Sequence, residues 1–328
     1  MKIASFFSGA GGLDLGFSNA GFNLVFANDN WRGCWETFEK NHNHSICKKS
    51  ITEIKPEEIP EVAGFVGGPP CQSWSLAGAM RGINDPRGKL FYNYVELIKV
   101  KQPLFFLAEN VPGILSDKHL PEFIKIIQKF EHMGYKISYE VLNAKDYGIP
   151  QDRKRIIIVG YHNRLGKKFE FPQPTNSNIL LKDAIGDLPP AKSAMERNKT
   201  NGKTKILNHE YMNGGFSTIY MSRNRVRGWD EHSFTIQAGG RHAPIHPQAP
   251  KMKFIEQNKR EFVKGKEHLY RRLSVRECAR IQTFPDDFEF FYLDVADGYK
   301  MIGNAVPVKL AEIIANRIME DIKHVKSG

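Results

Sequence analysis

Apolar strand-like runs alternate with helical patterns through the first half of this 328-residue chain. Residues 2–7 form an apolar run, a glycine turn follows at 8–12, and a helical pattern continues to residue 20. The alternation continues with strands at 24–27, 65–66, 104–107, 137–142 and 156–159, and with helices near 35–38, 90–100 and 120–133. Because such alternation builds a mostly parallel sheet, we expect an α/β fold that binds ligands at the carboxyl ends of its strands.

Two candidate binding elements follow the first two strands. The turn Ser8-Gly9-Ala10-Gly11-Gly12 exposes backbone N–H groups beside a helix N-terminus, which suits the polar or anionic part of a nucleotide-like ligand. The turn lacks the G-x-G-x-x-G spacing, and glycine turns also occur purely for packing. Asp29 follows the second strand, where it could bind ribose hydroxyls or serve as a helix N-cap.

A stiff turn with one thiol follows the strand at 65–66. Its residues are Gly67-Gly68-Pro69-Pro70-Cys71-Gln72-Ser73-Trp74-Ser75. The prolines fix the backbone, and the glycines let another chain segment or a ligand come close. Cys71 is either a positioned nucleophile or a buried cysteine in a proline-rich turn, and the turn alone favours neither interpretation.

Composition places the chain among soluble globular proteins. It has no run of eighteen apolar residues and no signal-peptide pattern at its start, so we expect a cytoplasmic protein. The four cysteines do not have the paired spacing of metal ligands, and they are too few for a scaffold held by disulfides. A net charge of +11 and a pI near 9.3 favour a polyanionic partner, although a basic balance also occurs on ordinary solvated surfaces.

The character of the chain changes near residue 182, where regular helices give way to polar, glycine-rich and proline-rich sequence. We expect one domain over 1–182 and 296–328, and a smaller irregular domain over 183–295. The second domain holds arginines interleaved with apolar residues at 222–229, a pattern that allows contact with phosphates and base edges but also fits a solvated loop. Helices are predicted at 272–282 and 308–322, the latter packing back on the first domain.

Six blocks along the chain stand in a recognisable order. They read F-S-G-A-G-G, G-G-P-P-C-Q-S, E-N-V, Q-D-R-K-R, R-x-x-x-R-E-C-A-R-I-Q-x-F-P and G-N-A-V-P. This order resembles the DNA (cytosine-5) methyltransferases over nearly the whole chain, more weakly at 160–205. Around M-S-R-N-R-V-R and H-P-Q-A-P, the second domain resembles HaeIII-type enzymes, which modify GGCC.

The resemblance implies a Rossmann-like methyltransferase domain, a target-recognition domain and S-adenosylmethionine as cofactor, converted to S-adenosylhomocysteine. Phe7 would lie against adenine, Asp29 would take the ribose hydroxyls, and no metal is implied. The cofactor-binding residues implied are Phe7, Gly9, Ala10, Gly11, Gly12, Leu13, Asp29, Asn30, Ser50, Ile51, Gly68, Pro70, Leu90, Asn304 and Ala305.

The catalytic residues implied by the resemblance are Cys71, Glu109, Arg153 and Arg155. The Cys71 thiolate would add to C6 of cytosine, so that C5 becomes a nucleophile. Glu109 would give a proton or strong hydrogen bond to N3. Arg153 would hold the O2 carbonyl, with Arg155 beside it or on phosphate.

Cytosine C6 is inaccessible in stacked duplex, so the resemblance also implies base flipping. The glycine-containing segment 72–89 fits a loop that closes over DNA, although it also fits an ordinary surface loop. Arg223, Arg225 and Arg241 are the expected base or phosphate contacts, and Ile219 the expected apolar wedge. The DNA-binding residues predicted are Gln72, Ser75, Arg87, Ile219, Arg223, Arg225 and Arg241.

Three positions depart from the family pattern. Family members commonly carry Glu and an aromatic where this chain has Asp29-Asn30, and an Asp where it has Ser50. A serine hydroxyl accepts a hydrogen bond from the adenine amino group without charge assistance, so we expect weaker cofactor binding. Residues 241–245 also differ from the HaeIII-type sequence.

These features predict the modification methyltransferase of a restriction-modification system, with double-stranded DNA as substrate and a companion endonuclease as expected partner. A tRNA cytosine-5 methyltransferase would use the same Cys and Glu, but the arginine-rich second domain favours duplex DNA. A DNA-binding regulator without catalysis would not need Cys71, Glu109 and Arg153 together, and all three are present.

Overall fold

The computed structural model describes residues 1–70, 88–175, 177–202 and 204–323. Contacts between Cα atoms divide the chain into two compact units. The first unit comprises Met1–Leu142, Lys154–Gln173 and Val308–Gly328, and the second comprises Asn143–Arg153 and Pro174–Pro307. The second unit is therefore larger than the domain expected at 183–295, because residues 143–153, 174–182 and 296–307 also belong to it.

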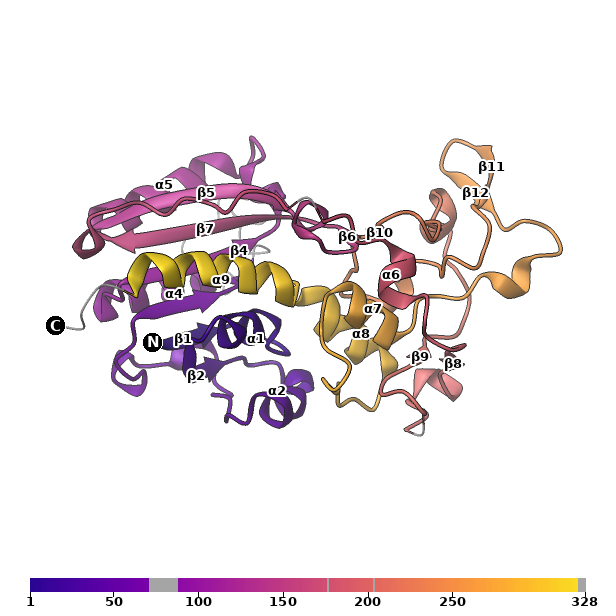
Figure 1. Cartoon of the computed structure of the whole chain (residues 1–328), viewed down its shortest axis with the longest axis horizontal. Coiled ribbons are helices and arrows are strands. Elements are labelled where there is room, and N and C mark those ends of the chain that lie inside the picture. The colour runs from indigo at the N-terminus through magenta and orange to yellow at the C-terminus, as the bar shows by residue number, and fades with distance from the viewer. Residues whose placement is uncertain (71–87, 176, 203, 324–328) are drawn as a thin grey trace. The chain divides into compact units, whose positions relative to one another are not determined.

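A six-stranded sheet, in the order β2-β1-β3-β4-β7-β5, forms the centre of the first unit (Figure 1). Its strands are β1 (Lys2–Phe6), β2 (Asn23–Asn28), β3 (Gly64–Gly67), β4 (Phe105–Asn110), β5 (Tyr135–Asn143) and β7 (Lys154–His162). The pairs β1–β2, β1–β3 and β3–β4 are parallel, whereas β7 runs antiparallel to β4. The mostly parallel α/β architecture is thus confirmed.

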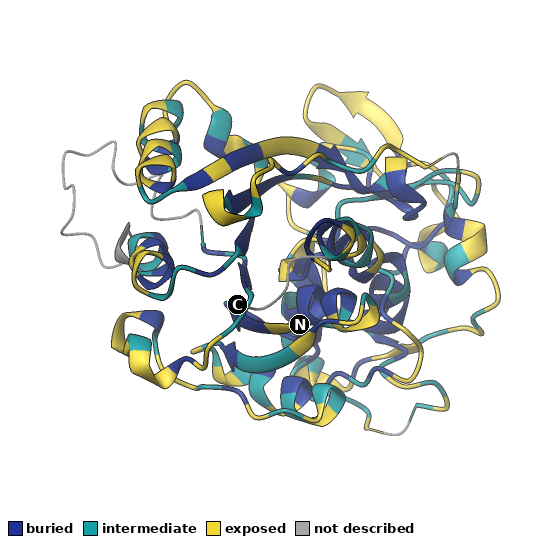
Figure 2. Cartoon of the chain, turned by 60° about the vertical axis from the view of Figure 1, so that its left-hand side comes forward, coloured by how far each residue is buried: buried dark blue, intermediate teal, exposed yellow. Residues whose placement is uncertain are grey.

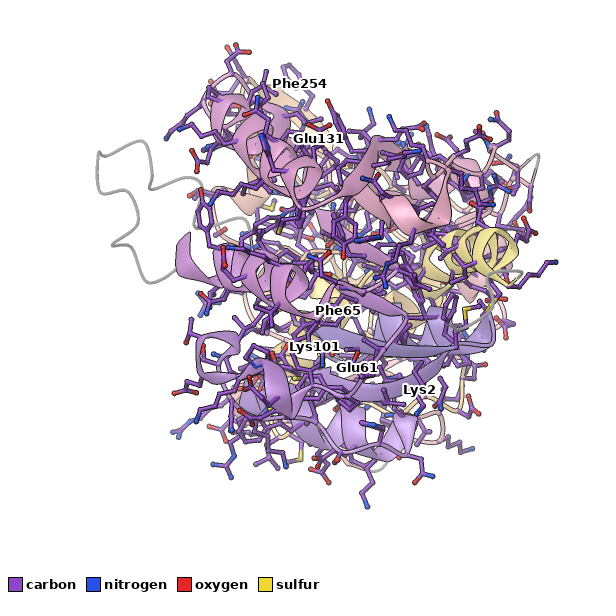
Figure 3. The ribbon with its side chains drawn as sticks, turned by 90° about the vertical axis from the view of Figure 1, so that its left-hand side faces the viewer. Lys2, Glu61, Phe65, Lys101, Glu131 and Phe254 are labelled. Carbon is purple, nitrogen blue, oxygen red and sulfur yellow. The ribbon has the colours of Figure 1, made fainter. Side chains whose placement is uncertain are left out.

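Helices cover both faces of this sheet. The helices of the first unit are α1 (Gly12–Asn19), α2 (Trp35–His42), α4 (Gly88–Lys101), α5 (Leu120–His132) and α9 (Val308–Ile322). Helices α4 and α5 pack on the face that carries Phe6, Phe65 and Phe106, all three fully buried. Figure 2 shows these central strands buried, and Figure 3 shows Phe65 inside this layer, with the Lys101–Glu61 ion pair at its surface.

The other face of the sheet carries α1 and α9. Phe17 of α1 stacks at 6.4 Å, centroid to centroid, on Phe105 of β4. Helices α1 and α9 approach closely at Gly16, where a Cβ atom would lie 2.5 Å from the Cβ of Ala311 and 2.6 Å from the carbonyl oxygen of Val308. The helix at 308–322 therefore packs on the first unit, as predicted from its apolar stripe.

Short helices and two-stranded ladders build the second unit. Its elements are α6 (Leu181–Ile185), α7 (Val275–Ile281), α8 (Val295–Asn304), β6 (Gln151–Asp152), β8 (Lys192–Ser193), β9 (Glu210–Tyr211), β10 (Ser233–Phe234), β11 (Lys253–Glu256) and β12 (Lys259–Glu261). Helix α8 was not predicted, and it packs against α7. In the described part of the chain, no helix is long and apolar enough to cross a membrane.

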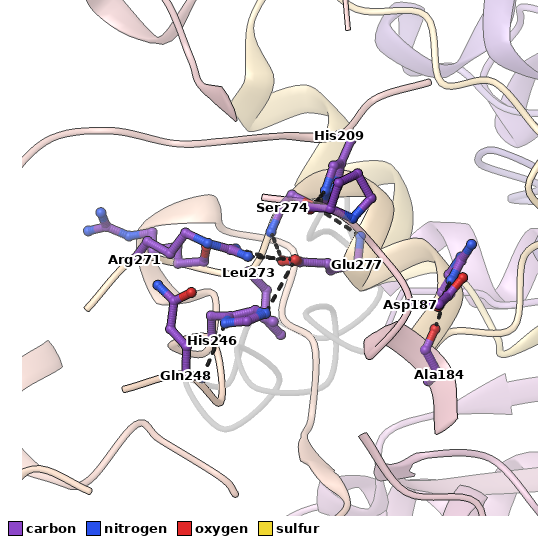
Figure 4. Close-up of polar contacts among 12 residues, drawn as sticks. Ala184, Asp187, His209, His246, Gln248, Arg271, Leu273, Ser274 and Glu277 are labelled. Carbon is purple, nitrogen blue, oxygen red and sulfur yellow. Dashed lines mark hydrogen bonds and ion pairs between the residues drawn. The ribbon is translucent and has the colours of Figure 1, made fainter. Parts of the chain in front are cut away.

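A buried carboxylate organises α7 in the second unit (Figure 4). Glu277 accepts two hydrogen bonds from the Arg271 guanidinium, at 2.7 and 2.8 Å, and one from the Ser274 backbone N–H at 2.7 Å. His246 lies 3.5 Å from the same carboxylate, and His209 lies 3.0 Å from the Ser274 hydroxyl. Burial alone would raise the pKa of Glu277, but the hydrogen bonds and charge of Arg271 lower it.

Candidate active site

The first glycine turn joins β1 to α1 through left-handed backbone. Phe7, Gly9 and Gly11 have φ angles of 56°, 56° and 86°. The Gly9 N–H donates to the Asp29 carboxylate at 2.9 Å, so the turn is tied to the carboxyl end of β2. This connection brings together the two elements that the sequence suggested for nucleotide binding.

His42, at the end of α2, packs on this turn and was not predicted as part of the site. Its Nε2 lies 3.2 Å from the carbonyl oxygen of Ala10. A Cβ atom at Gly11 would lie only 1.9 Å from the same nitrogen, so packing as well as backbone conformation requires glycine there. Burial lowers the pKa of His42 to about 4, which keeps its ring neutral near pH 7. His42 lies 32 residues after Ala10 in the sequence, so no local sequence pattern indicated that it packs on this turn.

The Gly67–Pro70 turn lies beside the end of β4. Because β3 and β4 are parallel and Gly67 pairs with Ala108, both strands end at the same edge of the sheet. The Asn110 side-chain amide donates to the Pro69 carbonyl oxygen at 3.0 Å. Residues Glu109 and Asn110 therefore sit directly against the turn that leads to Cys71, which itself lies outside the described residues.

Glu109 forms the charged centre of this edge. Its side chain is 11% exposed, and its Oε1 lies 2.8 Å from Nε of Arg155, at the start of β7. A Cβ atom at Gly68 would lie 3.3 Å from the other carboxylate oxygen, so backbone approaches Glu109 closely on that side. The antiparallel pairing of β7 with β4, with Ile157 opposite Glu109, is what brings Arg155 to the carboxylate.

Arg153 occupies a different environment from the one predicted. It is 1% exposed, and its guanidinium donates to the carbonyl oxygens of Ile236, Gly303 and Ala305 at 2.8–3.0 Å. These acceptors all belong to the second unit, which Arg153 holds together. That Arg153 holds the cytosine carbonyl stays a prediction, but these contacts direct its Nη donors to backbone, and Arg155 is the arginine paired with Glu109.

Comparisons with known proteins show the family of the chain. The model of the C-5 cytosine-specific DNA methylases matches residues 1–320. The chain belongs to the C-5 cytosine-specific DNA methylase family. It is 66% identical to the type II methyltransferase M.MthTI of Methanothermobacter thermautotrophicus over 326 residues, 99% of each chain. It is 55% identical to the type II methyltransferase M.FnuDI of Fusobacterium nucleatum, over 98% of this chain and 95% of the relative.

A solved structure agrees with this assignment at the level of the fold. The Entamoeba histolytica methyltransferase EhMeth superimposes with a TM-score of 0.72 at 17% identity, over 100% of this chain and 99% of that one. The protein is thus a DNA (cytosine-5) methyltransferase, and its family implies S-adenosylmethionine as the methyl donor.

The glycine turn of this methyltransferase fits that cofactor. Gly11 is the N-cap of α1 and supplies no side-chain hydrogen bond, so the first N–H groups of α1 lack a side-chain cap. A helix N-terminus of this kind suits the carboxylate of a methionine moiety. No atom of the described residues lies within 4 Å of where a Cβ of Gly9 would stand. Ala10, within the turn, and Leu13, in α1, are buried.

Other predicted cofactor residues have structural partners. Both Asp29 carboxylate oxygens accept backbone hydrogen bonds, from Gly9 at 2.9 Å and Trp31 at 2.8 Å. The Ser50 hydroxyl caps the short helix Ile51–Glu53, which gives this departure from the family pattern a local structural role. Ile51 belongs to the core below β1, and partly buried Phe7 and Leu90 pack against it, whereas Asn30 is exposed. Asn304 and Ala305 lie in the second unit, where α8 ends.

The predicted DNA-binding residues of the second unit divide into two groups. Ile219 is 70% exposed, and the exposed Arg223 and Arg241 make no hydrogen bond or ion pair with any residue that the structure describes. Arg225 is 8% exposed and donates to the carbonyl oxygens of Tyr220 and Ile219 at 2.9 and 3.2 Å. Direct contact of Arg225 with DNA stays a prediction, while its Nε and Nη2 donors bond to the neighbouring turn.

Two segments that carry the free side chains lie side by side. The Tyr220 hydroxyl donates to the Ala243 carbonyl oxygen at 2.7 Å, and the Ile245 N–H donates to the Arg225 carbonyl oxygen at 3.0 Å. These contacts hold 219–226 beside 241–245. Gln72, Ser75 and Arg87, the remaining predicted DNA contacts, lie outside the described residues, as does the segment 72–87 of the predicted closing loop.

Proposed function

We propose that this methyltransferase modifies C5 of one cytosine in a short, specific duplex sequence, as the modification enzyme of a cytoplasmic restriction-modification system. The observation that carries the proposal is the Glu109–Arg155 pair, held against the Gly67–Pro70 turn that leads to Cys71. A companion endonuclease that cuts the unmodified sequence is the expected partner.

Each residue of this edge has a distinct role in the proposal. The Cys71 thiolate adds to C6 of the flipped cytosine, while Glu109, in its protonated form, donates its carboxyl proton or a hydrogen bond to N3, so that electron density moves to C5. Arg155 holds the O2 carbonyl through guanidinium donors that its contact with Glu109 leaves available.

S-adenosylmethionine, when bound, supplies an electrophilic methyl group on a sulfonium. The Gly9–Leu13 turn and the N-terminus of α1 would hold its methionine end, and the Asp29 carboxylate would accept from the ribose hydroxyls. After C5 has gained the methyl group, a base, water in this proposal, removes the C5 proton. The C5–C6 double bond then re-forms and Cys71 leaves.

In the second unit, Arg223 and Arg241 are proposed to contact DNA, with Ile219 as an apolar wedge at the flipped base. Exposed arginines that have no partner among the described residues are available for phosphates and guanine edges, which accept hydrogen bonds from guanidinium. Arg225 is proposed to position Ile219, because it donates to the Ile219 carbonyl oxygen. Opening the base pair costs a few kcal/mol, which an inserted apolar side chain would partly offset.

The proposed target is GGCC. The segments M-S-R-N-R-V-R and H-P-Q-A-P, on which the likeness to HaeIII-type enzymes rests, belong to the two adjoining segments at 219–227 and 241–250. The family assignment favours DNA over the alternative substrate, tRNA.

A plasmid assay tests the target and the substrate together. Plasmid from cells that express the chain is digested with an enzyme that cuts unmodified GGCC and is sequenced after bisulfite treatment. The proposal expects protection and one modified cytosine per strand at GGCC. Purified protein with labelled S-adenosylmethionine should label duplex DNA but not tRNA. Modification at another sequence would overturn the proposal that GGCC is the target. Labelling of tRNA alone would overturn the proposal that DNA is the substrate.

A further inference from the structure

A cavity of about 610 Å³ lies within the second unit, outside the residues to which catalysis or base reading is assigned, Arg241 excepted. Arg197, Arg241, His242 and Arg272 contribute the basic part of its lining, and Asp294 contributes a carboxylate. Its volume falls in the range of small-molecule sites. Three arginines and one carboxylate in the lining favour an anion over an apolar ligand.

Arg272 is the buried cation of this cavity. It is 4% exposed, its Nη atoms donate to the carbonyl oxygens of Gly214 and Gly215 at 3.1 and 2.8 Å, and its guanidinium lies 4.2 Å from the Phe216 ring centroid. Its Nε has no hydrogen-bond partner in the part of the chain that the structure describes. No carboxylate among the described residues pairs with it, whereas Arg271 nearby pairs with Glu277. A buried positive charge without an acid favours an anion beside it.

The carboxylate of Asp294 has other partners. As the N-cap of α8, it accepts from the Ala296 N–H at 2.9 Å, and its second oxygen lies 4.0 Å from the Lys199 ammonium. Asp294 and Ala296, at the N-terminus of α8, both line the cavity. The Asp294 carboxylate thus contacts Ala296 and Lys199 and forms no ion pair with the described arginines of the cavity.

Arg197 stands at the accessible side of the cavity. Its side chain is 88% exposed, and its contact with Glu196, at 3.8 Å, joins two fully solvated groups. Arg197 and Asn198 both have left-handed φ angles, 55° and 59°, and the Asn198 side-chain oxygen accepts from the Asn213 N–H at 2.8 Å. Left-handed backbone at two successive non-glycine residues is uncommon and needs such fixation. The turn that presents Arg197 is therefore held in place.

We propose that this cavity binds a backbone phosphodiester of the substrate DNA, with Arg197 and His242 as the outer donors and Arg272 as the buried charge. The inference rests on the proposed function and deepens it, because it separates a site for affinity and positioning from the residues that read bases. Phosphate contacts fix register without reading sequence, so the cavity serves any duplex equally. Free phosphate shares this chemistry, and the test below separates the two sources.

Salt-dependent DNA binding tests the proposal. Binding of wild type, Arg197→Gln and His242→Gln to a cognate and a non-cognate duplex is measured between 50 and 200 mM salt. Arg197→Gln should weaken both complexes by the same factor, about threefold to tenfold, and reduce the slope of log K against log salt by about 0.9. His242→Gln should also weaken binding to the two duplexes by equal factors. Arg260→Gln is the matched control, since that arginine bonds to Glu256 and Lys259 carbonyl oxygens outside the cavity, and it should change neither value.

Two outcomes would overturn the proposal. One is a loss confined to the cognate duplex, which would make the cavity a base-reading site. The other is an unchanged slope in Arg197→Gln, with inorganic phosphate bound at micromolar concentration by wild type and not by the variant, which would make it a free-anion site. Since binding is measured without methyl transfer, an inactive wild type with the expected slopes would overturn the proposed function and leave this inference standing.

Discussion

Arg153 and Arg155 stand two positions apart and have different surroundings. Arg155 is paired with Glu109, whereas Arg153 is bonded to backbone of the second unit. The motif Q-D-R-K-R did not separate them, because the spacing says nothing about which carbonyl oxygens or carboxylates surround each guanidinium.

Arg155→Gln should therefore reduce the rate of methyl transfer by about 100-fold or more, with the melting temperature little changed. Arg153→Gln should destabilise the protein by about 3 kcal/mol, since several charged hydrogen bonds are lost and buried carbonyl oxygens are left unpaired. Single-turnover kinetics and thermal unfolding of both variants measure this. The reverse pattern, with Arg153→Gln stable but inactive, would contradict the assignment.

Asp14 carries a pH-dependent contribution to stability. It is fully buried in α1, and burial raises its pKa from 3.8 to about 7 despite the Ser5 hydroxyl nearby. The folded state therefore binds more protons than the unfolded state between these pH values, so this contribution is lost as pH rises to about 7.

Asp14→Asn removes this titration. The free energy of unfolding of the variant, minus that of wild type, should increase by about 1.4 kcal/mol per pH unit between pH 5 and 7 and level off above pH 8. Urea unfolding of both proteins from pH 5 to 9 measures the difference, in which the titrations shared by both proteins cancel. A difference that does not vary with pH would show that Asp14 is not protonated in the folded state.

The packing of α1 on α9 depends on one glycine. Alanine in a helix normally gains about 1 kcal/mol over glycine, but a Cβ at Gly16 would meet α9 backbone at 2.6 Å. Gly16→Ala should therefore lower the free energy of unfolding by about 2 kcal/mol. Gly113→Ala is the control, because no atom of the described residues lies within 4 Å of its Cβ position, and it should stay within about 0.5 kcal/mol of wild type. Equal stability of the two variants would refute the close approach.

Helix α8 shows why some elements could not be predicted from sequence. Gly298 and Gly303 argue against a helix by propensity, yet Cβ atoms there would lie 2.7 Å from the Tyr292 ring and 2.3 Å from Gln237 backbone. Tertiary packing requires both glycines. The strands of the first unit, in contrast, were predictable from their apolar runs, although the antiparallel direction of β7, which delivers Arg155 to Glu109, has no local signal.

The division of the whole molecule was predicted only in outline. A change in composition near residue 182 marks the second unit, but residues 143–153 join it through contacts distant in sequence, such as Gln151 with Gln282 at 2.7 Å. The first four motifs predicted the chemistry because they lie at the ends of strands. They did not show which arginines of the second unit have protein partners, since this depends on the folded surroundings of each side chain.

Covalent trapping tests the catalytic account most directly. A duplex with 5-fluorocytosine at the target position is incubated with the protein and S-adenosylmethionine. Since fluorine cannot leave as the C5 proton does, Cys71 should stay bonded to C6, giving a denaturant-resistant, one-to-one adduct. The adduct should be lost in Cys71→Ser and form much more slowly in Glu109→Gln. No adduct with wild type, or an equal amount with Cys71→Ser, would contradict the account.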